Sequence, residues 1–244
     1  MAPQPKKPSK PIFKTSTPFT ETKWPNVSHD DGEIVTELTC NLLAPIGEHR
    51  RTHIQLSKGK NRKRDIRLVS GDAHKVPVPA VASHILVGLN SVTRHLETLA
   101  ATTAPPTAPI NEVVDGQSSP TSGDDKSSIT PLKQLSVVIL THPQPSSSPV
   151  HAHIPTLLHL ATLRRDAKGK PSEPTRLVCL PTSTDNRLAS ALHIPRVGAI
   201  GIVEGAPGAK TLEEYVTKHV GLTECAWVDE ALRSEWRELN VQQG

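Results

Sequence analysis

Aromatic residues are scarce in this chain of 244 residues, where two Phe, three Trp and one Tyr make up only 2% of the sequence. Proteins that read single-stranded RNA stack its bases on several exposed rings, so this composition argues against that class of RNA binder. Cysteine is also rare: Cys40, Cys179 and Cys225 stand far apart and form no C-x-x-C pair. Neither a zinc site nor a disulfide framework is expected, and reduced intracellular thiols are the simplest interpretation.

Long apolar runs are missing as well. No run approaches the ~18 apolar residues that a membrane span requires, and the N-terminus carries no apolar signal segment. We therefore expect a soluble intracellular protein that makes no contact with a membrane.

Motifs that carry independent chemistry are also absent. Residues 141–165 hold several histidines but no Asp or Glu that would complete a metal site beside them. The glycines form neither a dinucleotide-binding nor a phosphate-loop motif, and no nucleophile turn is present. We expect no catalytic residue, no cofactor, no metal and no small-molecule substrate.

Proline and basic charge are what the chain has in quantity, with 23 Pro and a formal net charge of +4. Residues 1–27 are rich in Pro, Lys and Thr, which predicts an extended tail. Its aromatic residues Phe13, Phe19 and Trp24 would either anchor a partner protein or pack on the chain's own core. The sequence leaves both interpretations open.

A helix is predicted to open the folded part of the chain. Ser28 and Asp31 form the ends of a capping box, and Pro45 and Gly47 should end the helix. With the basic segment described next, this helix makes up residues 28–70. Further helix caps are predicted at Ser183 or Thr184 and in a capping box at Thr211–Glu214, and residues 225–244 are predicted to hold a last helix.

A dense basic segment follows the first predicted helix, with Asp65 as its only acid. Its cations are Arg50, Arg51, Lys58, Lys60, Arg62, Lys63, Arg64 and Arg67. A solvated loop, a nuclear import signal at residues 60–64 and contact with RNA phosphates are the three interpretations that remain. Phosphate contact would give an affinity that falls with salt, and it is compatible with nuclear import.

Strands and helices alternate through residues 76–224. Apolar runs predict strands near residues 84–87, 135–140, 176–180 and 197–203, and helical spacing follows each of them. This order predicts an α/β domain with a mostly parallel sheet and helices on both of its faces. Two polar stretches, residues 102–131 and 165–175, are expected to be disordered insertions in this domain.

The junction between the first strand of this domain and the helix after it has the most specific local chemistry. Gly88 permits a tight turn, and Asn90 is a natural N-cap for the helix. The backbone N–H groups of the first turn and Arg94 would together favour an anion such as phosphate. Most α/β folds need such a junction, so other parts of the sequence must support RNA binding.

Three sequence blocks supply that support. They are Gly88–Arg94 at the start of a helix, Leu135–Pro143 as a strand and turn, and Leu177–Pro195 as a strand, helix and loop that lead into Ala199–Val203. In this order the blocks resemble the kink-turn-binding ribosomal-protein superfamily of the L-seven-Ae and L-thirty-e kind.

Phrases nearer the N-terminus are more specific. Pro11–Thr15, Pro18–Thr20, Trp24–Pro25 and Pro45–Arg50 before Ser57–Lys60 resemble the fungal Pop-three subunit family of ribonuclease P and ribonuclease MRP. Together with the blocks, this resemblance covers most of the chain outside the two insertions.

The resemblance implies a three-layer sandwich that binds RNA with the start of the Asn90 helix and with the loop that precedes Ala199. The residues indicated are Gly88, Asn90, Ser91, Thr93, Arg94, Ile194, Pro195, Arg196, Val197 and Gly198. Ser91 replaces a family Glu that holds a base, and Thr141–Pro143 replaces an acidic turn. Recognition through the RNA backbone and shape is therefore expected in place of base readout.

The function implied is that of a non-catalytic subunit of an RNA-based endoribonuclease. Its partners would be the RNAs of ribonuclease P and MRP and the sister protein subunits. It would act in tRNA 5′-end maturation and precursor rRNA processing, in the nucleus and nucleolus. The alternatives are a kink-turn protein of a small nucleolar or ribosomal particle, and an interaction adaptor that docks through its N-terminal tail.

Overall fold

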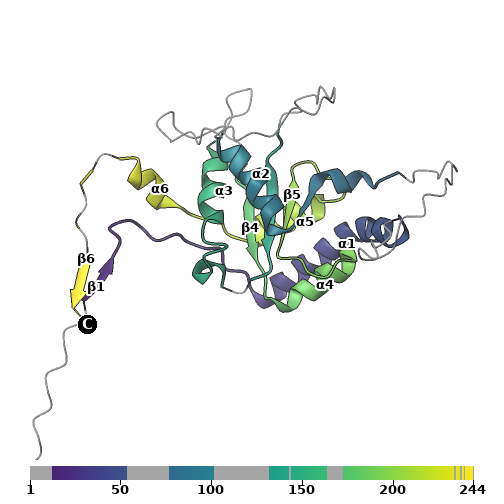
Figure 1. The fold of residues 1–244 in the computed structure, drawn as a ribbon, viewed down its shortest axis with the longest axis horizontal. Helices are drawn as coiled ribbons and strands as arrows, with labels where there is room; N and C mark the ends of the chain where they lie inside the picture. Colours follow the sequence, from purple (N-terminus) through teal and green to yellow (C-terminus); the bar gives the residue numbers. More distant parts are fainter. Residues whose placement is uncertain are drawn as a thin grey trace, which may run out of the picture. The chain divides into compact units, whose positions relative to one another are not determined.

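The computed structural model of the chain describes residues 13–53, 77–101, 132–142, 144–163, 173–233, 235–236, 238 and 240–243 (Figure 1). The chain divides into two compact units, which are described separately below. The larger unit spans residues 24–223, and the smaller one combines residues 1–23 with residues 224–244. Most of the basic segment and of both predicted insertions lies outside the described residues.

The larger unit is an α/β domain built on a four-stranded sheet with the order β2-β5-β3-β4. The strands are β2 (Ile85–Val87), β3 (Leu135–Leu140), β4 (Arg176–Cys179) and β5 (Ala199–Val203). Only β3 and β4 run parallel, while β5 is antiparallel to both β2 and β3. The prediction of a mostly parallel sheet was therefore wrong. β3 and β5 are buried on both faces, and such burial produces a continuous apolar run whatever the strand direction.

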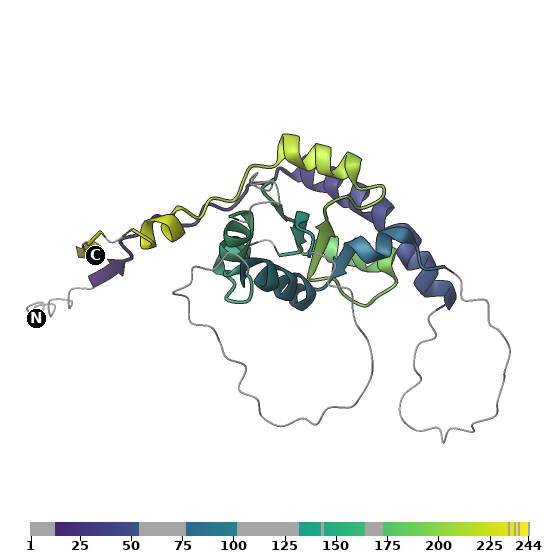
Figure 2. The ribbon, with the colours of Figure 1, turned by 90° about the horizontal axis from the view of Figure 1, so that it is seen from above.

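Helices pack on both faces of this sheet. They are α1 (His29–His53), α2 (Leu89–Ala101), α3 (Ile154–Thr162), α4 (Ser183–Leu192) and α5 (Lys210–His219), with short 3-10 helices at Ala80–His84 and Pro145–Ser147. A first core joins α1, α4 and α5 to one face, and a second core joins α2 and α3 to the other. Figure 2 shows α1 and α5 on the side of the strands opposite to α2.

Alternation along the central strands assigns their side chains to the two cores. In β3, Val137 and Ile139 belong to the first core, whereas Val138 and Leu140 belong to the second. In β5, Gly201 lies where a side chain would meet α2: an added Cβ would be 3.2 Å from Cγ2 of Val92. The glycine thus lets α2 approach the sheet closely.

The helix α1 begins as predicted but ends later. The Ser28 side-chain oxygen accepts the backbone N–H of Asp31 at 3.1 Å, which confirms the N-terminal cap. Pro45 lies inside the helix, which continues to His53, so the prediction that Pro45 and Gly47 end it was wrong. An interior proline costs a helix about 3 kcal/mol. Here the cost is offset by the burial of Leu42, Leu43 and Ile46 in the first core on either side of it.

The first turn of α1 is also tied to α5. The Tyr215 hydroxyl donates to Oδ1 of Asp31 at 2.7 Å, and Nδ1 of His219 lies 3.2 Å from the same oxygen. The rings of Tyr215 and His219 stack with centroids 4.3 Å apart. Hydrogen bonds from Ser28 and then Tyr215 hold the pKa of the Asp31 carboxyl below its usual value.

The other predicted helix caps are not formed. Helix α4 begins at Ser183 after Thr182, and α5 begins at Lys210 after Ala209, in each case without a side-chain cap hydrogen bond. Thr184 is instead buried inside α4.

The smaller unit pairs the two ends of the chain. Strand β1 (Phe13–Ser16) runs antiparallel to β6 (Asn240–Gln243), and Nζ of Lys23 lies 3.0 Å from Oε1 of Glu224. The helix predicted for residues 225–244 is only the short α6 (Ala226–Ala231). Beyond it Leu232 and Trp236 are exposed. An apolar helical face that packs against no other surface gains little stability.

Two glycines of α1 give a prediction about helix packing. A Cβ at Gly47 would lie 1.9 Å from the Ala191 carbonyl oxygen of α4, whereas a Cβ at Gly32 would lie 3.5 Å from its nearest neighbour. We expect Gly47→Ala to lower the free energy of unfolding by about 3 kcal/mol, because the backbone of α1 or α4 must move to make room for the added methyl group. Gly32→Ala, in the same helix, should raise it by about 0.5–1 kcal/mol. Urea denaturation of both variants checks the pair, and equal effects would contradict this packing.

Candidate nucleic-acid interface

Two segments that are far apart in the sequence meet at one end of the sheet. Here β2, β3 and β4 finish and β5 begins, and we call this the Gly88 end. Gly88 has a φ of +95°, a conformation that L side chains rarely adopt. Its N–H donates to the Ala199 carbonyl at 2.8 Å, and its own carbonyl accepts the N–H of Val92 at 3.2 Å. The turn before α2 is thereby fixed to the first residue of β5.

The start of α2 differs from the prediction in one respect. The helix begins at Leu89, so Asn90 is its second residue and the predicted N-cap role of Asn90 was wrong. The side chains of Asn90, Ser91 and Arg94 are exposed there, and Thr93 is half-buried. The polar groups of the first turn thus face solvent, where a ligand can reach them.

The loop before β5, residues 194–198, is held by two side chains that the sequence did not indicate. Oδ1 of Asp185 accepts the N–H of Val197 at 2.6 Å, and the Thr141 hydroxyl donates to the Val197 carbonyl at 2.6 Å. The Thr141 N–H also donates to the Gly198 carbonyl at 3.3 Å. A threonine after a buried strand and an Asp in the first turn of a helix are common features, so neither signalled this role.

This anchoring separates the predicted site residues of the loop into two groups. Val197 is buried, so it acts through its backbone and its side chain is unavailable to a ligand. Pro195, Arg196 and Gly198 are exposed, and Ile194 is partly buried against the first core. Nothing lies within 4 Å of the position of a Cβ on Gly198, so a ligand can approach the backbone closely here.

The charge at the Gly88 end favours an anion. Arg94 and Arg196 are exposed on the two segments that meet there. The partial positive charge of the α2 N-terminus adds to theirs. The carboxylate of Asp185 is partly buried and engaged with the N–H of Val197. Backbone N–H groups, two guanidinium groups and a helix N-terminus suit the phosphates of a nucleic acid.

The other predicted contact residues are placed elsewhere or not described. Arg50 and Arg51 lie in the last turn of α1, and Nη2 of Arg51 is 2.7 Å from Oε2 of Glu48. The remaining cations of the basic segment lie outside the described residues: Lys58, Lys60, Arg62, Lys63, Arg64 and Arg67.

The aromatic residues of the N-terminal tail divide between the two units. Phe13 begins β1, and Phe19 is partly buried in the smaller unit. Trp24 packs against the second core of the larger unit. Of the two interpretations left open for Trp24, packing on the chain's own core is the one observed.

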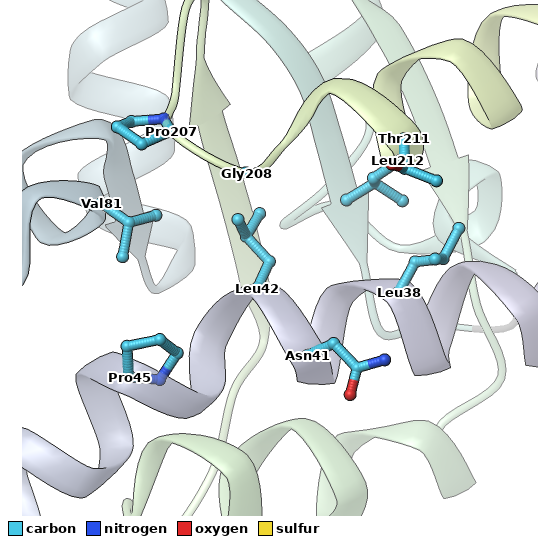
Figure 3. Close-up of a pocket in the computed structure, with 9 residues that line it drawn as sticks. All are labelled: Leu38, Asn41, Leu42, Pro45, Val81, Pro207, Gly208, Thr211 and Leu212. Atoms are coloured by element: carbon cyan, nitrogen blue, oxygen red, sulfur yellow. The ribbon is translucent and has the colours of Figure 1, made fainter.

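A hollow of about 300 Å³ lies at the opposite end of β5 (Figure 3). Its lining residues are Leu38, Asn41, Leu42, Pro45, Val81, Pro207, Gly208, Thr211 and Leu212. None of these side chains ionises near neutral pH, so the hollow offers mainly apolar contact, with the Asn41 amide and the Thr211 hydroxyl as the polar side-chain groups of its lining.

The three cysteines are poor candidates for reactive residues. Burial raises the pKa of the Cys179 thiol to about 12, and it also raises the pKa values of Cys40 and Cys225. Thiols with such pKa values stay protonated at neutral pH and are poor nucleophiles.

The described residues contain no group of His, Cys, Asp or Glu arranged to hold a metal ion. Among them no helix has the length and apolarity for a transmembrane segment.

The chain matches no protein-family model and no curated protein.

Asp185 gives a prediction about the loop. Asp185→Ala removes the acceptor of the Val197 N–H, and an unpaired N–H there should cost about 1–3 kcal/mol of stability. Asp185→Asn keeps a side-chain oxygen in place and should cost much less. Urea denaturation together with hydrogen exchange at the Val197 amide measures both effects. An unchanged exchange rate in Asp185→Ala would show that Asp185 does not hold the loop.

Proposed function

We propose that the chain is a non-catalytic RNA-binding subunit of the ribonuclease P and ribonuclease MRP ribonucleoproteins. Its α/β domain would be the three-layer α/β/α sandwich of the kink-turn-binding superfamily, with helices on both faces of a mixed sheet. The subunit would stabilise the catalytic RNA in tRNA 5′-end maturation and precursor rRNA processing, in the nucleus and nucleolus.

One observation carries the proposal: the hydrogen bond from the Gly88 N–H to the Ala199 carbonyl at 2.8 Å. The resemblance rests on sequence blocks that are far apart, and it implies RNA binding only if those blocks meet. The bond joins the block that begins at Gly88 to Ala199, the first residue of β5, which directly follows the loop that ends at Gly198. Thr141, from the block between them, is bonded to the same loop. All three blocks are thus joined by hydrogen bonds at the Gly88 end.

The proposed mode of binding is recognition of a bent RNA backbone. The first turn of α2 and Arg94 would meet phosphates on one side, and Arg196 and the open backbone at Gly198 would meet them on the other. Ser91 has a short side chain that cannot take the role of the longer family Glu on a base. Affinity would therefore come from phosphates and RNA shape, with base readout contributing less.

Contacts with sister subunits would use the smaller unit. An isolated two-stranded pairing such as β1 with β6 is marginally stable in water, and association with a partner would stabilise it. The Leu232 and Trp236 side chains are 63% and 84% exposed, so they can still be buried by a partner. Large exposed aromatics of this kind are frequent anchors of protein interfaces.

Two arginines test the RNA-binding surface. We expect Arg94→Gln with Arg196→Gln to raise the Kd for a kink-turn hairpin RNA about tenfold and to flatten its dependence on salt, because two phosphate contacts are lost. Lys210→Gln is the matched control, since Lys210 is an exposed cation beyond the opposite end of β5. Fluorescence anisotropy across a salt series gives both quantities. Equal Kd values for the double variant and the control would reject this surface.

A further inference from the structure

Three histidines of the loop between β3 and α3 gather beside the start of α2. The rings of His142 and His151 have centroids 4.8 Å apart. Nε2 of His153 lies 3.3 Å from the Thr93 hydroxyl of α2, and Nδ1 of His151 lies 2.9 Å from the Ser148 hydroxyl. The bond to Thr93 ties the histidine loop to the helix turn that carries Arg94. The cluster therefore adjoins the Gly88 end, although it was not among the predicted RNA-binding residues.

The hydrogen bonding leaves a donor available on His142. Its Nδ1 accepts the backbone N–H of Gln144 at 3.2 Å, so a neutral His142 carries its proton on Nε2. That N–H is then the group His142 offers to a ligand. A neutral imidazole can donate to a phosphate oxygen. A protonated imidazole adds a positive charge, and on His142 the second proton would replace the bond that Nδ1 accepts from the Gln144 N–H.

The chain segment that carries the cluster contains no acidic residue. Residues 141–163 contain no Asp or Glu and no Lys or Arg. The elements packed against the cluster contribute the exposed Arg94 and Glu97 of α2 and the half-buried His159 of α3. Burial first, and then the charges of His142 and His153, lower the pKa of His151. A bound phosphate would relieve that repulsion, so protonation of the cluster and anion binding should favour each other.

We propose that His142, His151 and His153 form a second contact with the RNA backbone, one that takes up protons as phosphate binds and so strengthens as the pH falls. This inference rests on the RNA-binding function proposed above and extends its surface from the start of α2 to the loop before α3. Phosphodiesters do not titrate between about pH 6 and pH 8, so a pH dependence in this range would come from the protein.

The test measures the Kd of a kink-turn hairpin RNA at about pH 6 and about pH 8. Each proton taken up changes the Kd by at most about tenfold per pH unit, so partial uptake predicts about tenfold tighter binding by the natural chain at the lower pH. His142→Gln with His151→Gln should reduce the ratio of the Kd at about pH 8 to the Kd at about pH 6 to about twofold. His95→Gln is the matched control, because His95 lies on the same helix α2 but bonds to the Lys133 carbonyl at the opposite end of β3. It should keep the full ratio.

A second variant keeps the test decisive if the double variant does not fold, which circular dichroism would reveal. His142→Arg supplies a fixed positive charge, so it should bind at about pH 8 as tightly as the natural chain binds at about pH 6. A purely structural role for His142 would instead make this variant bind more weakly at both pH values.

The outcomes separate the two proposals. The natural chain and the double variant could both bind RNA with the same ratio of Kd values at the two pH values. This result overturns the histidine contact and leaves the proposed function standing. Failure of the natural chain to bind the RNA at either pH overturns the proposed function, and the histidine contact with it.

Discussion

The direction of β5 is the constraint on which the candidate interface depends. This strand lies between β2 and β3 and runs antiparallel to both, so it starts where they end. The loop before β5 is thereby brought to the turn before α2 and to the residues after β3. Had β5 run parallel to β3, the loop at residues 194–198 would lie at the other end of the sheet and the Gly88 turn would have no partner.

The path of α4 makes this direction possible. The end of β4 and the start of β5 both pair with Leu140, so α4 leaves and its loop returns at the same end of the sheet. The helix is held in place by its close contact with α1 at Gly47 and by the burial of Leu188 and Leu192 in the first core. Asp185, in its first turn, then fixes the returning loop through the Val197 N–H. The helix packing and the loop geometry are thus parts of one arrangement.

Local features were predictable from the sequence, and features that depend on distant contacts were not. The Ser28–Asp31 cap, the positive φ of Gly88 and the apolar strands follow from neighbouring residues. The antiparallel course of β5, the passage of α1 through Pro45 and the pairing of β1 with β6 depend on packing between segments far apart in the chain. The roles of Asp185 and Thr141 were missed for the same reason, since each acts on a loop that is remote in sequence. Trp24 carried no signal that distinguished a docking anchor from a core residue.

The measurement that tests the central claim most directly is the identity of the RNA bound to the chain in cells. The tagged chain is purified from its native cells, the RNA that accompanies it is sequenced, and cleavage of precursor tRNA by the purified material is assayed. The proposed function predicts recovery of the ribonuclease P and MRP RNAs together with cleavage at the tRNA 5′ end. Recovery of box C/D small nucleolar RNA or ribosomal RNA alone would contradict it and assign the chain to another particle. Recovery of no RNA would contradict RNA binding itself and favour an interaction adaptor.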